Sequence, residues 1–219
     1  MKEQERKVVI FDLDGTLVDS VEDIAYTINL AAKDFSLRTV TKEEVLSAIG
    51  NGSNSLLKST ICKDASEEEF NKIYPVFIDY YSNAPKPNTK LFEGIKEVLV
   101  ELKKRGYLLA VLTNKPQSAT DLVEKTLLNE LGFDIIVGQT KQTKAKPDKE
   151  SANPVLTALS VKPENSIMVG DMATDFLTAK NCGLQSIIAQ WGYGKEAELR
   201  ALGATVFAPN PLSLLDLIK

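Results

Sequence analysis

Two carboxylates, Asp12 and Asp14, stand two positions apart, directly after an apolar segment that begins at Val8. A short apolar and β-branched run of this kind predicts a strand buried on both faces of a parallel sheet. Carboxylates at the carboxyl end of such a strand lie where open α/β sheets place their ligands. A calcium-binding EF-hand loop is excluded, because its glycine and glutamate positions, counted from Asp12, hold Leu17 and Asp23. An acidic turn that caps a helix remains as the alternative.

Further polar residues follow other predicted strands. Thr113 and Asn114 end one apolar run, and Asp171 and Asp175 come soon after another. Lys146 precedes a proline that can begin a helix. Each group has a simple alternative: a plain turn for the Thr-Asn pair, a solvated charge for the lysine, and helix-start acids for the two aspartates. Their common placement at strand or loop ends predicts that they share one rim of the sheet with the Asp-x-Asp segment.

The elements that must position these residues alternate along the chain. Apolar runs predict strands over 8–12, 108–113, 134–137, 166–170 and 185–189. Amphipathic patterns predict helices over 92–105, 117–131, 150–160, 174–182 and 195–202. Strands that alternate with helices of this length form βαβ units. The predicted fold class is therefore α/β, with a doubly wound parallel sheet.

One long segment breaks this alternation, because it carries helical patterns and no convincing strand. Two Ser/Thr-x-x-Glu sequences in it have the spacing of capping boxes at helix starts, Thr41 with Glu44 and Ser66 with Glu69. Aromatic residues between 70 and 81 recur at helical spacing, which predicts a small apolar core. We therefore predict a catalytic core made of residues 1–19 and 88–219, and an inserted all-helical domain of residues 20–87.

The composition excludes several classes of protein. The chain has 219 residues, of which 43% are hydrophobic and 26% are charged, as in ordinary soluble domains. A net charge of −4 without a basic block argues against nucleic-acid and membrane partners. The absence of histidine removes Ser-His and Cys-His catalysis and His-ligated zinc sites. Cys62 and Cys182 are too far apart in the sequence for a CxxC motif. With no membrane-spanning run and no signal-like N-terminus, we expect a cytoplasmic protein.

The sequence resembles the haloacid dehalogenase superfamily of phosphohydrolases in four motifs. They are the Asp12-Leu-Asp14-Gly-Thr segment, Thr113-Asn114, Lys146-Pro147 and Gly170-Asp171 with Asp175. The resemblance covers residues 7–219 and implies a Rossmann-like core with an inserted helical cap of the superfamily's first type. Two glycine-containing segments, 49–52 and 191–194, are similar to segments of phosphoglycolate phosphatases.

This resemblance implies Mg²⁺-dependent hydrolysis of a phosphate monoester through an aspartyl-phosphate. Asp12 would attack phosphorus, while Asp14 would protonate the leaving oxygen and then activate the hydrolytic water. The implied catalytic residues are Asp12, Asp14, Thr113 and Lys146. The implied metal ligands are the side chains of Asp12 and Asp171 and the main-chain carbonyl of Asp14. Asp175 binds the metal directly or through water, or orients the other ligands. The implied substrate contacts are Thr113, Asn114, Lys146 and, in the helical insertion, Asn51.

The implied substrate is a small phosphorylated metabolite, and the resemblance favours phosphoglycolate. Pyrophosphate and sugar or nucleoside phosphates remain alternatives within the superfamily, and a phosphorylatable signalling module is an alternative of another class. Asp14 argues against a dehalogenase, because halide departure needs no proton, and the lack of histidine argues against a β-phosphoglucomutase. The candidates to bind the carboxylate of phosphoglycolate are Asn51 and the main-chain amides of the turn 50–52, with help from a cap lysine such as Lys58. We expect a monomer or a weak dimer.

Overall fold

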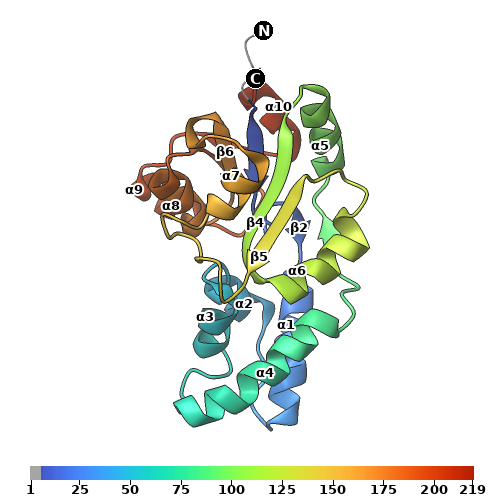
Figure 1. Ribbon diagram of the computed structural model, residues 1–219. Coiled ribbons are helices and arrows are strands. Elements are labelled where there is room, and N and C mark those ends of the chain that lie inside the picture. Colours follow the sequence, from blue (N-terminus) through green and yellow to red (C-terminus); the bar gives the residue numbers. More distant parts are fainter. Residues whose placement is uncertain (1–5) are drawn as a thin grey trace.

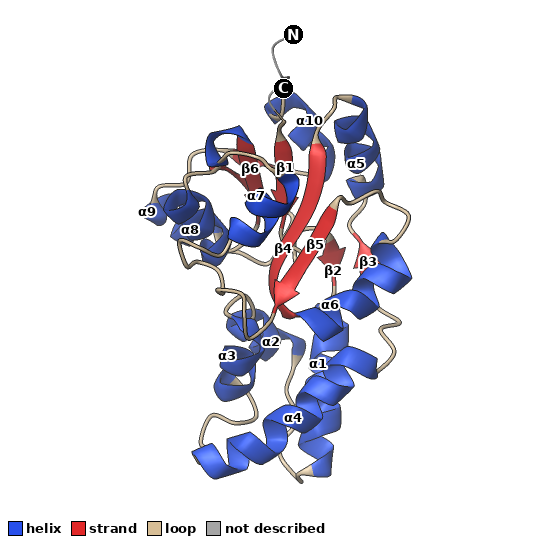
Figure 2. Ribbon diagram, viewed as in Figure 1, coloured by secondary structure: helices blue, strands red, loops and turns tan. Residues whose placement is uncertain are grey.

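The computed structural model describes residues 6–219, and its centre is a six-stranded parallel sheet (Figures 1 and 2). The strands lie in the order β5-β4-β1-β6-β7-β8. Their bounds are β1 Val8–Phe11, β4 Leu108–Pro116, β5 Ile135–Gln139, β6 Ser166–Gly170, β7 Gln185–Ala189 and β8 Phe207–Ala208. The predicted α/β class and the doubly wound parallel sheet are confirmed.

Helices cover both faces of the sheet, and the side chains of β1 alternate between them. Val9 and Phe11 join an apolar cluster with α5 and α10, whereas Val8 and Ile10 join a second cluster with α7 and α8. All four side chains are 0% exposed, which is why the strand is apolar at every position. The helices of this part of the chain are α5 Ile95–Lys104, α6 Gln117–Val123, η1 Glu124–Leu128, α7 Asn153–Leu159, η2 Pro163–Asn165, α8 Ala173–Cys182, α9 Glu196–Leu202, η3 Pro211–Ser213 and α10 Leu214–Leu217.

Two predicted elements differ from the structure in extent or type. Strand β4 continues beyond residue 113 to Pro116, because Asn114 and Lys115 are buried polar residues that an apolar pattern does not count. The helix predicted over 117–131 consists of α6 and the π-helical segment η1. The two helix types place apolar side chains at similar intervals over one turn, so the sequence pattern did not distinguish them.

Four helices lie over the carboxyl edge of the sheet, between the short strands β2 (Val18–Asp19) and β3 (Lys90–Leu91) (Figure 1). Their apolar residues form a cluster of their own, which includes Phe70, Phe77 and Tyr81, as the aromatic spacing predicts. Both predicted capping boxes are present, at the starts of the second and fourth helices. We call these helices the cap: α1 Val21–Asp34, α2 Lys42–Ala48, α3 Gly52–Ser59 and α4 Glu67–Asn83. The domain boundaries at residues 20 and 87 stay a prediction.

The two chain segments that connect the cap to the sheet are held together at one junction. Strands β2 and β3 pair there in antiparallel fashion. The carboxylate of Asp23 is 0% exposed and accepts hydrogen bonds from the backbone N–H groups of Asn88 and Thr89 and from both of their side chains, at 2.6–3.1 Å. The segment that leaves the sheet and the segment that returns to it are therefore joined through one buried side chain.

Candidate active site

The polar residues predicted to share a rim do lie at one edge of the sheet. Asp12 and Asp14 follow β1, Asp171 follows β6, and the last residues of β4 include Thr113. Because all six strands are parallel, their carboxyl ends meet at this edge, and the cap covers it (Figure 1). The strand and loop ends thus place the predicted side chains under the cap.

Lys146 connects two of the predicted aspartates. Its ammonium lies 2.7 Å from Oδ1 of Asp12 and 2.6 Å from Oδ1 of Asp175, and its side chain is 2% exposed. Burial alone would lower the pKa of Lys146, but the two carboxylates raise it above its ordinary value. Lys146 is therefore a permanent positive charge beside Asp12. The second oxygen of Asp175 accepts a hydrogen bond from the backbone of Met172, so Asp175 orients Lys146 from a fixed position.

Asp171 is held by residues from two other segments. Its Oδ1 accepts a hydrogen bond from the hydroxyl of Thr16 at 2.7 Å, and its Oδ2 accepts one from the backbone N–H of Tyr193 at 2.8 Å. A Cβ at Gly194 would overlap the carbonyl oxygen of Asp171. This close approach gives a physical reason for glycine in the segment 191–194, which brings the Tyr193 backbone to the carboxylate.

Three buried carboxylates, of Asp12, Asp171 and Asp175, fit a divalent cation. Oxygen atoms of all three lie within 4.8 Å of one another. Burial raises the pKa of Asp12 to about 7, against the opposing effect of Lys146, and burial also raises the pKa of Asp171 well above its usual range. A cluster of buried carboxylates with so little compensating charge is a set of hard oxygen donors that suits Mg²⁺.

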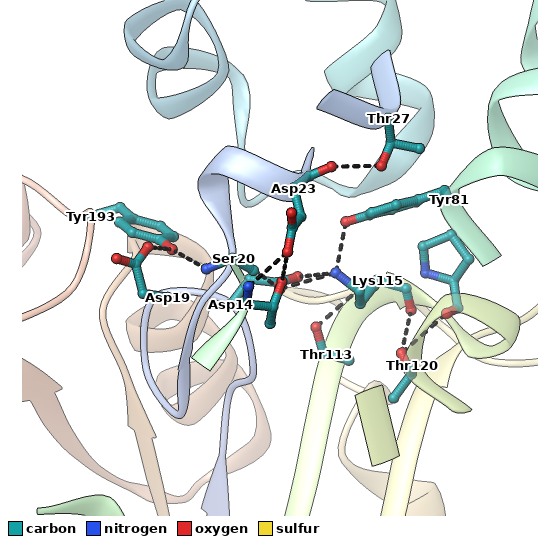
Figure 3. Close-up of polar contacts among 12 residues, drawn as sticks. Asp14, Asp19, Ser20, Asp23, Thr27, Tyr81, Thr113, Lys115, Thr120 and Tyr193 are labelled. Atoms are coloured by element: carbon teal, nitrogen blue, oxygen red, sulfur yellow. Dashed lines mark hydrogen bonds and ion pairs between the residues drawn. The ribbon is translucent and has the colours of Figure 1, made fainter. Parts of the chain in front are cut away.

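The side chain of Asp14 takes part in a second cluster of polar contacts (Figure 3). Its Oδ1 accepts a hydrogen bond from the hydroxyl of Ser20 at 2.5 Å. Both of its oxygens contact the ammonium of Lys115, at 3.0 and 3.1 Å. The same ammonium lies 2.9 Å from the hydroxyl of Tyr81, which belongs to cap helix α4. Asp14 is therefore in contact with a buried lysine of the core, and through it with the cap.

Asn114 positions the loop that carries Lys146. Its Oδ1 accepts a hydrogen bond from the backbone N–H of Lys146, and its Nδ2 donates to the carbonyl of Lys146 and to that of Gly50 in the cap. The hydrogens of this amide are thus engaged within the protein. Thr113, by contrast, accepts a hydrogen bond through its hydroxyl from the N–H of Lys115 and lines the cavity, where its own hydrogen can be donated.

A small cavity lies between these residues and the cap. Its volume is about 40 Å³, enough for roughly three water molecules. Core residues form its floor, namely Asp12, Asp14, Thr113, Asn114, Lys115, Pro116, Lys146 and Met172. Cap residues form its roof, namely Ile49, Gly50, Gly52, Ser53, Leu56 and Tyr81. The cavity joins the Asp12 and Asp14 clusters in one chamber.

The two cap residues suggested by the sequence lie outside this chamber. Asn51 is exposed, and its neighbours Gly50, Gly52 and Ser53 line the cavity instead. Lys58 is also on the surface, where it pairs with Glu67 at 2.7 Å. A turn at the start of a helix does not reveal which of its side chains faces inward, and this is why the sequence pointed to Asn51.

Three residues of the site were missed in the sequence. Lys115 directly follows Thr113 and Asn114, and its position beside this motif is the sequence feature that could have identified it as a site residue. Tyr81 was assigned only to the apolar core of the cap, because helical spacing does not reveal a hydroxyl that reaches out of that core. Tyr193 lies in the segment noted only for its glycines, and its hydroxyl donates to Asp19 and accepts from the N–H of Ser20 (Figure 3).

Comparison with known proteins identifies the family to which the chain belongs. Residues 9–189 match the family model of haloacid dehalogenase-like hydrolases. The chain belongs to this family. It is 31% identical to a phosphoglycolate phosphatase of Vibrio parahaemolyticus, over 100% of this chain and 98% of the relative. It is 35% identical to one of Aquifex aeolicus, over 86% and 87%. The crystal structure of a predicted phosphoglycolate phosphatase from Haemophilus somnus superposes with a TM-score of 0.87 at 28% identity, over 99% of both chains. The sequence-based resemblance to this family and to its phosphoglycolate phosphatases is confirmed.

Proposed function

We propose that this hydrolase is a phosphatase that cleaves small phosphate monoesters, with phosphoglycolate as its preferred substrate. The observation that carries the proposal is the chamber in which Asp12, Asp14 and two buried lysines face one another beneath the cap. The relatives named phosphoglycolate phosphatase, which match the chain over nearly its full length, support the choice of substrate.

Asp12 is the proposed nucleophile. Lys146 holds one of its oxygens, at 2.7 Å, and so fixes the orientation of the carboxylate. Attack of a carboxylate oxygen on phosphorus forms the aspartyl-phosphate while the ester P–O bond breaks. The ammonium of Lys146 and the hydroxyl of Thr113 are placed to stabilise the charge on the phosphoryl oxygens.

Asp14 is the proposed acid and base. It lies in the same chamber as Asp12, and its two contacts, Ser20 and Lys115, hold its carboxyl group in one orientation. In the first half of the reaction it gives a proton to the leaving alkoxide. In the second half it takes a proton from the water that attacks the aspartyl-phosphate, which returns Asp12 and releases inorganic phosphate.

Asp12 and Asp171, with Asp175 oriented beside them, would hold Mg²⁺, and the main-chain carbonyl of Asp14 is the further ligand that we propose. When bound, the cation supplies positive charge between the carboxylate of Asp12 and the phosphate dianion, which would otherwise repel each other. The cluster of buried carboxylates within 4.8 Å supports this assignment.

The small chamber supports a small substrate. A volume of about 40 Å³ is less than a phosphorylated metabolite occupies, so the cap must move away to admit one. The described residues include no helix long and apolar enough to cross a membrane. A cytoplasmic location and a monomeric or weakly dimeric state stay predictions.

A panel of phosphate esters tests the proposal. We expect turnover that requires Mg²⁺, with phosphoglycolate hydrolysed at a kcat/KM at least ~10-fold above that of ethyl phosphate, about 1.4 kcal/mol. Higher efficiency with pyrophosphate, a sugar phosphate or a nucleoside phosphate would replace phosphoglycolate as the substrate. A single slow phosphorylation without turnover would indicate a signalling module.

The nucleophile is tested by Asp12→Asn, which is nearly isosteric. A neutral amide neither attacks phosphorus nor binds Mg²⁺ well, so we expect kcat to fall by at least about 10⁴-fold. Circular dichroism should show that the fold is retained. Asp216→Asn, which changes an exposed aspartate of α10, is the matched control and should leave kcat unchanged. An active Asp12→Asn enzyme would exclude the mechanism.

A further inference from the structure

Lys115 is a second buried cation in the chamber, and the proposed phosphoryl chemistry does not use it. It is the penultimate residue of strand β4, directly before Pro116, and its side chain is 1% exposed. Within the part of the chain that the structure describes, Lys146 is the other cation that lines the cavity. Lys146 is held between Asp12 and Asp175, beside the reacting phosphorus. Because an ammonium is costly to bury, a second one in so small a space requires a separate reason.

The ammonium of Lys115 makes three hydrogen bonds, to two partners within the protein. An ammonium has three hydrogens to donate. The two oxygens of Asp14, at 3.0 and 3.1 Å, lie on one side of it, and the hydroxyl of Tyr81, at 2.9 Å, lies on another (Figure 3). The ring of Tyr81 also covers the charge, with its centroid 4.4 Å from Nζ. Because the two oxygens of Asp14 belong to one carboxylate, a single hydrogen of the ammonium can serve both, and a ligand in the cavity that Lys115 lines can then accept another.

The position of Lys115 relative to Asp14 determines which atoms of a bound substrate the ammonium can contact. In the proposed reaction Asp14 contacts the ester oxygen of the substrate, and Lys115 lies one hydrogen bond beyond Asp14. In a phosphate ester of an α-hydroxy acid, the carboxyl carbon is two single bonds of about 1.5 Å each from that ester oxygen. A carboxylate at this distance from the reacting bond falls beside the ammonium. An uncharged alkyl group in the same place would leave the ammonium without a new partner.

We propose that Lys115 is the residue that binds the substrate carboxylate, so that the site selects phosphate esters of short α-hydroxy carboxylic acids. This inference rests on the proposed phosphatase function and assigns its specificity to one side chain. Tyr81 of the cap orients the ammonium, so the carboxylate site is complete only when the cap lies on the core. Neither Asn51 nor Lys58, which the sequence suggested for this task, lies in the chamber.

The test compares two substrates of equal length, phosphoglycolate and ethyl phosphate, with the wild-type enzyme and three variants. Lys115→Met removes the charge and keeps most of the length of the side chain. Lys115→Gln removes the charge but keeps a group that can hydrogen-bond to Asp14 and Tyr81. Lys86→Met is the matched control, because Lys86 also lies near the Tyr81 ring but donates its hydrogen bonds to carbonyl groups outside the cavity lining.

We expect both Lys115 variants to lose the preference for phosphoglycolate, with the ratio of the two kcat/KM values falling at least ~10-fold. The Lys86 variant should keep the wild-type ratio. Since Lys115 also contacts Asp14, hydrolysis of both substrates can slow in the variants, and the ratio separates this effect from carboxylate binding. If the Met variant does not fold, the Gln variant decides.

A ratio of the two kcat/KM values that stays at the wild-type value would overturn the inference. If both values fell equally, Lys115 would act only through Asp14, and if neither fell, Lys115 would have no role in hydrolysis. A wild-type enzyme that does not prefer phosphoglycolate to ethyl phosphate is a different failure: it would exclude the proposed substrate, whatever the Lys115 variants do.

Discussion

At the scale of single residues, the site concentrates negative charge on side chains that are largely shielded from bulk solvent. Asp12, Asp171 and Asp175 are each at most 8% exposed. Lys146 contacts two of the three, and the hydrogen bonds to Asp171 come from the neutral groups of Thr16 and Tyr193. The buried cluster is therefore short of positive charge in the absence of a cation.

This imbalance predicts how the stability of the metal-free protein depends on pH. Burial raises the pKa of Asp12 from 3.8 to about 7, so between these values the folded chain holds a proton that the unfolded chain has lost. Stability of the metal-free protein should then fall as the pH rises through this window. Mg²⁺ supplies the missing charge, and we expect it to raise Tm more at pH 7.5 than at pH 5.

The measurement is thermal unfolding followed by circular dichroism, with and without Mg²⁺, at both pH values. Asp171→Asn removes one proposed ligand, so its Mg²⁺-dependent rise in Tm should be smaller and should need more Mg²⁺. Asp134→Asn alters a carboxylate that pairs with Lys103, far from the cluster along the sheet, and should keep the full response. A rise in Tm that does not depend on Asp171 would contradict the assignment of the cation site.

Residue types at strand ends allowed most of this site to be predicted from the sequence. Asp12, Asp14 and Asp171 follow strand ends, which the parallel sheet brings together, and Lys146 lies in the loop after β5. Lys115 could not be predicted in the same way. Its role depends on the direction of one side chain and on a tyrosine that lies far from it in the sequence.

At the scale of elements, the junction between cap and core depends on Asp23 in α1. The carboxylate of this residue accepts four hydrogen bonds from Asn88 and Thr89, in the segment that returns from the cap. Such a bond set can form only if the first cap helix and the returning segment meet in a fixed orientation. The capping boxes that begin α2 and α4 were predictable from local spacing, whereas this contact joins residues too distant for any local pattern to reveal.

Asp23→Asn should destabilise the protein, because its amide would place N–H groups against donors that need an acceptor. We expect the free energy of unfolding to fall by about 3 kcal/mol in urea titrations. Glu22→Gln is the matched control, since Glu22 precedes Asp23 in the same helix but forms only an exposed pair with Lys42. Its cost should stay below about 0.5 kcal/mol. Similar values for the two variants would mean that the junction does not depend on the Asp23 carboxylate.

At the scale of the whole molecule, we expect the cap to move, because cap residues roof the chamber that a substrate has to enter. Cap and core are joined by hydrogen bonds of Tyr81 with Lys115, of the Gly50 carbonyl with Asn114 and of Ser82 with Ser118, and Ala119 of α6 packs in the apolar cluster of the cap. The connecting segments near residues 17–20 and 84–90 are where we predict the hinges. The sequence predicted the inserted helical module and its place over the strand ends, but not the short strands β2, β3 and β8, because two residues carry no periodicity.

Spin labels can measure this movement as a distance between cap and core. In a Cys182→Ser background, one label at Glu68→Cys on α4 and one at Lys104→Cys on α5 report on the relative position of cap and core. We expect a broad distance distribution in the free protein, which narrows with Mg²⁺ and vanadate because closure adds contacts to the ligand. A pair at Lys104→Cys and Glu198→Cys, both outside the cap, should not respond. Identical distributions in both states for the first pair would argue against a moving cap.

The place of β1 in the middle of the sheet has a consequence for how the protein is made. Val8 pairs with Leu108 on one side and with Ser166 on the other, so the first strand to be synthesised is flanked by strands that come much later. At roughly 5–20 residues per second, the ribosome needs about 5–20 s to supply the first neighbour and longer to supply the second. During that time the cap helices, whose apolar cluster lies almost entirely within residues 21–81, can already pack against one another. The inserted cap therefore lengthens the interval in which the apolar strand β1 of the nascent chain is unpaired, and an unpaired apolar strand is prone to aggregate while translation continues.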